Sequence, residues 1–285
     1  MIDISGENVV LVGALLLFVA VMAGKVAYRF GAPALLLFLG VGMLFGLDFI
    51  SYRSVDMTQF VGMIALCIIL FTGGMDTSFQ EIKPIIGPGV VLATVGVVMT
   101  AVVLAGFVWL IAPWIGLQIS FPLALLLAST MSSTDSASVF SILRSKKQGL
   151  KQHLRPLLEL ESGSNDPMAY MMTILLISIV TNTSGGVGMG MSIVYFVIQM
   201  IVGALSGYLI GRLAVWTINK INLANHSLYS VLLLAFIFFA FAFTDLVRGN
   251  GYLAVYLAGL VVGNHKLTQK RSLTVFFDGF TWLMQ

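Results

Sequence analysis

Two polar stretches, STMSSTDS at residues 129–136 and ESGSNDP at residues 161–167, interrupt segments of the sequence that are otherwise hydrophobic. Ionisable and hydroxyl side chains are costly inside a bilayer, and where they occur they mark ion or proton pathways. Both stretches contain acidic residues, and they lie on consecutive hydrophobic segments. The sequence therefore predicts a cation or proton site between two neighbouring membrane helices, which favours a role in transport.

The composition is that of a polytopic membrane protein. Hydrophobic residues make up 59% of the 285 residues and charged residues only 9%, which is too apolar for a water-soluble domain of this length. The single cysteine, Cys67, excludes a disulfide framework and a cysteine-based metal site. Asp3 and Glu7 precede the first apolar run and no basic region does, which argues against a cleaved signal peptide. We expect no cofactor, no transition metal and no nucleic-acid partner.

Hydropathy along the chain predicts about ten membrane helices when a span of roughly 20 residues is the ruler. The last expected helix has only about a dozen residues, too few to span a bilayer as written. The predicted helices cover residues 9–24, 33–50, 60–74, 86–113, 121–143, 157–180, 192–216, 228–246, 252–263 and 273 to the end.

The distribution of basic residues predicts the orientation of these helices. With the N-terminus outside, only Arg53 and Arg248 of the 15 lysines and arginines face outward. Such an excess on one side is the signature of cytoplasmic loops. The residues expected inside are Lys25, Arg29, Lys83, Arg144, Lys146, Lys147, Lys151, Arg155, Arg212, Lys220, Lys266, Lys270 and Arg271.

The first polar stretch predicts a break in the helix at residues 121–143. Hydroxyl side chains compete with the helix for backbone hydrogen bonds, and an acidic side chain at this depth needs water, a cation or a partner. Thr134 and Asp135 fall a little past the middle of the segment. An unwound break there would offer free carbonyl groups to an ion. The alternative is a seam of small residues for close helix packing, which leaves Asp135 unexplained.

The second polar stretch lies on the next helix. At about 100° per residue, Ser162, Asn165 and Asp166 share one face, whereas Glu161 lies roughly 140° from Asp166. We therefore expect Ser162 and Asp166 to face the break, Asn165 to tether it by hydrogen bonds, and Glu161 to point to another helix. Pro167 weakens backbone hydrogen bonding in the preceding turn, which would let the carbonyl groups there turn outward.

Together the two motifs, Thr134-Asp135 and then Glu161-Ser162 with Asn165-Asp166, resemble those of NhaP-type members of the monovalent cation:proton antiporter (sodium/hydrogen exchanger) superfamily. The resemblance covers essentially the whole chain. It implies that Asp166 is the essential, catalytic carboxylate that exchanges a cation for a proton. It further implies that Thr134, Asp135 and Ser162 complete the cation site, and that Asn165 and Glu161 support it.

The resemblance also implies a fold, a cellular location and partners. The fold is all-α and NhaA-like, with inverted repeats and discontinuous helices, and about ten of its thirteen helices are present here. The expected domains are 1–85, helices 1–3 of a dimer-side scaffold; 86–181, helices 4–6 and half of the ion-translocating core; and 182–285, helices 7–10 of the scaffold. The protein would be a homodimer in the plasma (inner) membrane of a bacterium, and its partners would be K⁺ or Na⁺, H⁺ and membrane lipid.

Two departures from the family pattern bear on these expectations. Many relatives carry an acidic residue where this chain has Thr72, in the segment FTGG at residues 71–74. With the second polar stretch, this variant looks most like the potassium/proton branch, so K⁺ is favoured and Na⁺ is next, and Thr72 and Ser133 are further candidates for the site. The chain also stops before the last three helices, including the arginine that the family pairs with Glu161. We therefore expect a fragment that does not transport alone.

Two other functional classes remain open. A cation channel or a nontransporting ion sensor would have a similar site, but a channel would show no obligatory coupling to protons. An intramembrane aspartyl protease would also place aspartates such as Asp135 and Asp166 on neighbouring helices. Those aspartates lack the Tyr-Asp and Gly-x-Gly-Asp contexts of such proteases, so we expect that the protein is not an enzyme.

Overall fold

The computed structural model describes residues 6–30, 34–48, 55–134, 150–151, 154–181 and 189–284. Every regular element in these ranges is helical. Asp135 of the predicted site lies outside them, as do Arg53, Arg144, Lys146 and Lys147 of the predicted loops.

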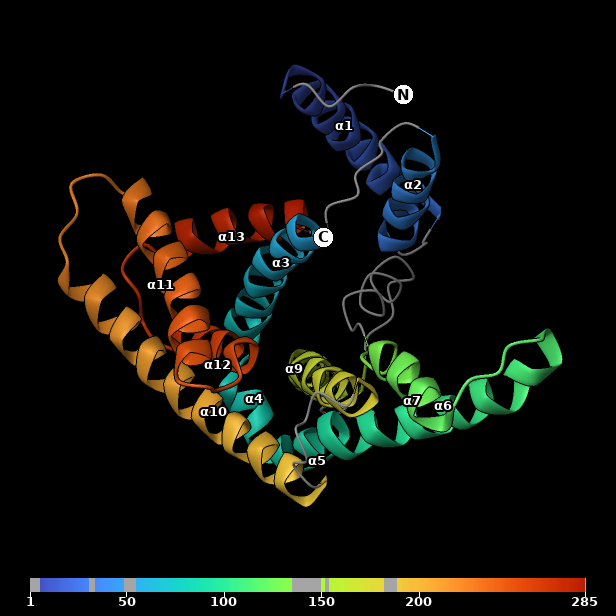
Figure 1. Ribbon diagram of the computed structural model, residues 1–285. Coiled ribbons are helices and arrows are strands. Elements are labelled where there is room, and N and C mark those ends of the chain that lie inside the picture. The colour runs from blue at the N-terminus through green and yellow to red at the C-terminus, as the bar shows by residue number, and fades with distance from the viewer. Residues whose placement is uncertain are drawn as a thin grey trace. The chain divides into compact units, whose positions relative to one another are not determined.

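The observed helices follow the predicted ones closely, and Figure 1 labels them along the chain. The main difference is the fourth segment, which begins at Phe79 and not at residue 86. Pro84 and Pro88 divide its first part into short helices but do not end it. The elements are α1 (Gly6–Phe30), α2 (Ala34–Asp48), α3 (Val55–Asp76), α4 (Phe79–Ile82), η1 (Lys83–Ile85), α5 (Ile86–Val91), the π-helical turn η2 (Leu92–Gly96), α6 (Val97–Ile111), η3 (Ala112–Ile115), α7 (Phe121–Thr130), α9 (Leu154–Val180), α10 (Met189–Lys220), α11 (Ser227–Leu246), α12 (Gly251–Gly263) and α13 (Lys270–Met284).

Several of these segments are long and apolar enough to cross a membrane, which confirms the prediction of a multi-pass membrane protein. Helix α9 is not among them, because it carries the second polar stretch. The candidate spans in the described residues are Val10–Ala27, Val55–Asp76, Phe79–Ile115, Val194–Lys220 and Ser227–Leu246.

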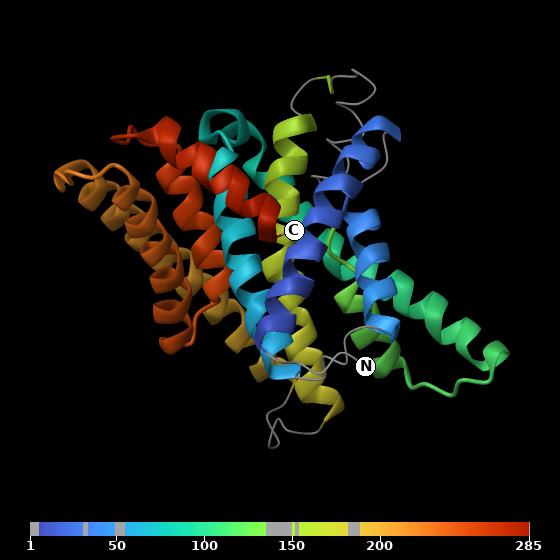
Figure 2. The same ribbon diagram turned by 90° about the horizontal axis from the view of Figure 1, so that it is seen from above.

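The chain divides into two compact parts. One comprises residues 1–61 and 135–151 and contains the helix pair α1 and α2, which pack on each other. The other comprises residues 62–134 and 152–285. Within this second part, α9 lies between α7 and α12, as both ribbon views show (Figures 1 and 2).

Helix α12 is the most buried element of the second part, and glycines let its neighbours approach it closely. A methyl group at Gly74 of α3 would overlap the Tyr256 carbonyl oxygen, and methyl groups at Gly259 and Gly263 of α12 would overlap carbonyl oxygens of α3. On the other side, a methyl group at Gly207 of α10 would overlap the Ala254 carbonyl oxygen. Close backbone contact through small residues is how membrane helices associate where lipid removes the hydrophobic driving force.

This contact predicts different effects for two adjacent glycines of α3. Gly74→Ala should lower the free energy of unfolding by about 1–3 kcal/mol, because the new methyl group meets rigid backbone. Gly73→Ala should leave it unchanged or raise it by about 0.5–1 kcal/mol, because no atom lies within 4 Å of a Cβ at that position. Thermal unfolding of the two purified variants in detergent measures the difference, and equal midpoints would contradict the close packing of α3 on α12.

Candidate functional site

Hydroxyl side chains end helix α7 within the first polar stretch. Ser129 Oγ donates to the Leu126 carbonyl and Thr130 Oγ1 to the Leu127 carbonyl, at 2.7 Å each, and Ser132 Oγ donates to the Ser129 carbonyl at 2.8 Å. These bonds give the last turn partners that do not continue the helix. The helix ends at Thr130, and residues 132–134 have no regular structure. The end of the helix at Thr130 agrees with the predicted break, and residues 135–143 of the predicted helix lie outside the described residues.

Helix α9 runs beside the end of α7. Ser129 Oγ and Thr173 Oγ1 lie 3.0 Å apart and form a hydrogen bond between the two helices. Ser129 is fully buried, so at this residue the hydroxyl-rich stretch does act as a packing seam. Four residues further on, at Ser133, the same stretch meets the polar residues of α9.

Four side chains of α9 meet the break after α7: Glu161, Ser162, Asn165 and Asp166. Ser162 Oγ donates to the Thr134 carbonyl at 3.0 Å, and Asn165 Nδ2 donates to the same carbonyl at 3.2 Å. Ser133 Oγ donates to Asp166 Oδ1 and lies 3.1 Å from Asn165 Oδ1. We call Ser133, Thr134, Glu161, Ser162, Asn165 and Asp166 the break cluster.

Asn165 is the centre of the break cluster. Its side chain is fully buried, and its amide nitrogen also lies 2.6 Å from Thr134 Oγ1 and 3.1 Å from Glu161 Oε1. An amide supplies donors and an acceptor together, so this one residue satisfies groups on both segments. These hydrogen bonds agree with the interpretation that Asn165 tethers the break.

The prediction that Glu161 points to another helix is wrong. Its carboxylate accepts hydrogen bonds from Thr134 Oγ1 at 2.8 and 2.9 Å, so it faces the break and not another helix. The helical wheel fixes only the direction of the Cα–Cβ bond, whereas the long glutamate side chain reaches around the helix to the nearest donors. Helix α9 also continues through Pro167 without interruption, so the expected weakening does not break it.

The structure places Thr72 in a different environment. Its hydroxyl is buried, donates to the Ile68 carbonyl at 2.9 Å and accepts a hydrogen bond of 2.8 Å from Thr281 of α13. The hydrogen bonds of Thr72 among the described residues therefore run to its own helix and to α13, and not to the break cluster. Asp135, the residue after Thr134, lies outside the described residues.

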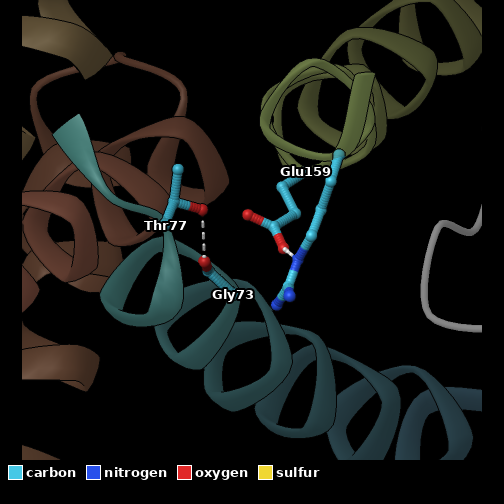
Figure 3. A network of polar contacts seen from close by, with 4 residues as sticks. Gly73, Thr77 and Glu159 are labelled. Carbon is cyan, nitrogen blue, oxygen red and sulfur yellow. Dashed lines mark hydrogen bonds and ion pairs between the residues drawn. The ribbon is translucent and has the colours of Figure 1, made fainter. Parts of the chain in front are cut away.

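No prediction from the sequence included Thr173, whose hydroxyl bonds to Ser129 and joins α9 to α7. It lies seven residues after Asp166, so the two share a face of α9, and this spacing was a usable signal. Glu159 also belongs to α9, but it lies outside the break cluster. Arg155 Nε donates to its carboxylate at 2.9 Å, and Figure 3 shows the Glu159 side chain extending toward the end of α3 near Thr77.

The break cluster offers hard oxygen ligands, which suit Na⁺ or K⁺ better than a transition metal. Carboxylate, hydroxyl and carbonyl oxygens come from two different segments of the chain. Within the described part of the chain, no three His, Cys, Asp or Glu side chains are grouped as a metal site would need. The arrangement is chemically fit to hold a monovalent cation or a proton.

Comparison with known proteins decides the family. The transmembrane model of the sodium/hydrogen exchanger family matches residues 14–284. The chain belongs to this family. Among curated exchangers, it is 38% identical over 280 residues to the K(+)/H(+) antiporter NhaP of Alkalimonas amylolytica, and 34% identical over 278 residues to the K(+)/H(+) antiporter NhaP2 of Shewanella sp. (strain ANA-3).

The same comparisons show what share of each relative's length this chain matches. The two alignments cover 97% and 96% of this chain but 47% of each relative, so the chain spans about half their length. The sodium proton antiporter MjNhaP1 from Methanocaldococcus jannaschii has a similar fold, with a TM-score of 0.73, 20% sequence identity and coverage of 98% of this chain and 70% of that one. The likeness confirms the all-helical antiporter fold class.

Two threonines near the end of α7 test the hydrogen bonds of the break cluster. Thr134→Val should lower the free energy of unfolding by about 1–3 kcal/mol, because the fully buried Asn165 amide and the Glu161 carboxylate both lose the Thr134 hydroxyl as a hydrogen-bond partner. Thr130→Val should change it by less than about 0.5 kcal/mol, because among the described residues the exposed hydroxyl bonds to a carbonyl of its own helix. Thermal unfolding in detergent compares the variants, and an equal loss from both would contradict the network.

Proposed function

We propose that the protein containing this chain is a secondary antiporter that exchanges a monovalent cation for protons. The observation that carries the proposal is the Asp166 carboxylate beside the Ser133 hydroxyl, where an unwound segment meets a helix of a multi-pass membrane protein. An acidic side chain held among oxygen atoms at such a break is suited to bind a cation and a proton in turn.

The proposed site has Asp166 as the residue that exchanges the two ions. Thr134, Asp135 and Ser162 complete the cation site, with Ser133 as a further ligand. Support comes from the contacts of Ser133 and of the Thr134 carbonyl with α9. Asn165 and Glu161 hold the two segments together. Thr72 lies outside this site, and its hydroxyl is hydrogen-bonded to the hydroxyl of Thr281.

Competition for Asp166 is sufficient for the exchange. When the carboxylate is deprotonated, its oxygens replace part of the water shell of a cation. When it takes up a proton, it loses its charge and its attraction for the cation, which leaves. Because the two ions bind to the same group in turn, each one drives the release of the other, and the gradient of one ion moves the other.

Alternating access turns this competition into transport. We assign residues 86–181 to the moving half-core and residues 1–85 and 182–285 to a dimer-side scaffold, as in inverted-repeat transporters. The core faces each side in turn when a cation or a proton is bound. The protein would be a homodimer in lipid, in the inner membrane of a bacterium, with its N-terminus outside, as the distribution of basic residues indicates.

Potassium is the favoured cation. The curated relatives reported above, at 34% and 38% identity, are K(+)/H(+) antiporters, whereas a Na(+)/H(+) antiporter, NhaS1 of Synechocystis sp., is 26% identical over 260 residues. Sodium is the second candidate.

Replacing Asp166 tests the mechanism. In everted membrane vesicles containing the complete protein, Asp166→Asn should abolish the dissipation of a proton gradient on addition of K⁺, because the amide cannot exchange a proton for a cation. Glu159→Gln is the matched control, since this carboxylate lies on the same helix and pairs with Arg155 outside the break cluster. It should retain most of the wild-type rate.

The outcomes separate the alternatives. A response to Na⁺ or Li⁺ in place of K⁺ would keep the mechanism and change the selectivity. Normal exchange by a folded Asp166→Asn variant would refute the role of Asp166. Large single-channel currents without proton coupling would indicate a channel, and no response to any cation from folded wild-type protein would indicate a sensor.

A further inference from the structure

Helix α12 touches α9 at three places around Asp166. Asn250, the residue before α12, has a side chain only 2% exposed, and its Nδ2 donates to the Pro167 carbonyl at 3.3 Å. Pro167 is the residue directly after Asp166. This hydrogen bond therefore links the start of α12 to the backbone beside the proposed exchange residue.

The Asn250 side chain has little freedom to move. Its Oδ1 accepts a hydrogen bond of 3.0 Å from the Leu253 backbone N–H, which caps α12, so the amide nitrogen must face the Pro167 carbonyl. Its own backbone N–H donates to the Gln199 carbonyl of α10 at 2.9 Å. A methyl group at Gly203 of α10 would approach the Asn250 carbonyl oxygen at 2.6 Å. Asn250 is thus fixed by α10 and α12 together.

Two aromatic contacts complete the seam between α12 and α9. The Tyr252 and Tyr170 rings meet edge to face, with centroids 4.7 Å apart. The fully buried Tyr256 ring lies against Gly163, where a methyl group would overlap its ring carbons. The contacts reach α9 on both sides of Asp166.

We propose that Asn250 is a positioning residue: its hydrogen bond to the Pro167 carbonyl holds Asp166 in position. The Tyr256 ring, packed against Gly163, limits the approach of α9 to α12 at a second point. This inference rests on the proposed function. Pro167 has no N–H, so the helix lacks one backbone bond in this turn. An outside donor at the Pro167 carbonyl holds the turn that carries Asp166 against the scaffold. Small displacements of a reacting group are costly, about 100-fold in rate for an ångström.

The simpler role for Asn250 is that of a helix cap. Serine and aspartate are also good caps, but neither supplies an amide donor at the Pro167 carbonyl. Asn250→Ser and Asn250→Asp therefore separate the two roles. Asn225→Ser is the matched control, because the Asn225 side chain accepts from the Ser227 backbone N–H at the start of α11 and is exposed.

The test uses the complete protein in reconstituted vesicles with K⁺ as the probe, and Na⁺ in its place if that is the ion the wild type exchanges. If Asn250 positions Asp166, both Asn250 variants raise the KM for the cation by about tenfold or more and shift the pH profile of exchange, in protein that cooperative thermal unfolding shows to be folded. Gly163→Ala, which displaces α9 from the other contact, should change the KM in the same direction. Asn225→Ser should behave as wild type.

A second measurement does not depend on transport. Spin labels on Ile177→Cys of α9 and Leu246→Cys of α11, both exposed positions, report the distance between α9 and the helices that hold Asn250. The Asn250→Ser change should shift or broaden this distance, and Asn225→Ser should not. Unchanged distances together with a wild-type KM and pH profile would overturn the positioning role. If wild-type protein fails to exchange any cation while the distance still shifts, the proposed function fails and the contact stands.

Discussion

The structure depends on one constraint: a backbone that leaves its helix inside a membrane protein must find hydrogen-bond partners within the protein. Helix α7 ends at Thr130, and the chain that follows has no regular structure. Ser162 and Asn165 of α9 supply donors to the Thr134 carbonyl. The end of α7 and the polar turn of α9 therefore stabilise each other.

The same constraint explains why polar residues gather where they do. Once α9 carries donors for the break, it also carries groups that need partners, and Glu161 finds them in the Thr134 hydroxyl and the Asn165 amide. A carboxylate with such donors is partly compensated without a fixed positive charge beside it. Asp166, beside Ser133 in the same network, lies among groups that can rearrange their hydrogen bonds when an ion binds or leaves.

Much of this arrangement was predictable from the sequence. Runs of apolar residues located the helices, and the excess of hydroxyl residues at 129–136 located the helix break, because both effects are local. The direction of Glu161 was not predictable, since it depends on how near Thr134 comes to α9. Neither was the separate environment of Thr72, which depends on α13, more than 200 residues away in the sequence. The contact of Asn250 with Pro167 is likewise tertiary, and the motif Gly249-Asn250-Gly251 alone indicates only a turn.

The glycine contacts of α12 have a consequence for how the molecule can be observed. Its backbone lies against the backbones of α3 and α10 with no side chain between them, so it cannot shift relative to α10 without separating the two helices. Almost all of α12 is buried, and chemical probes cannot reach it. Leu205 and Leu209 lie on the exposed side of α10, within the candidate span Val194–Lys220. A small fluorophore attached there through an introduced cysteine would report the position of α12 from the lipid side.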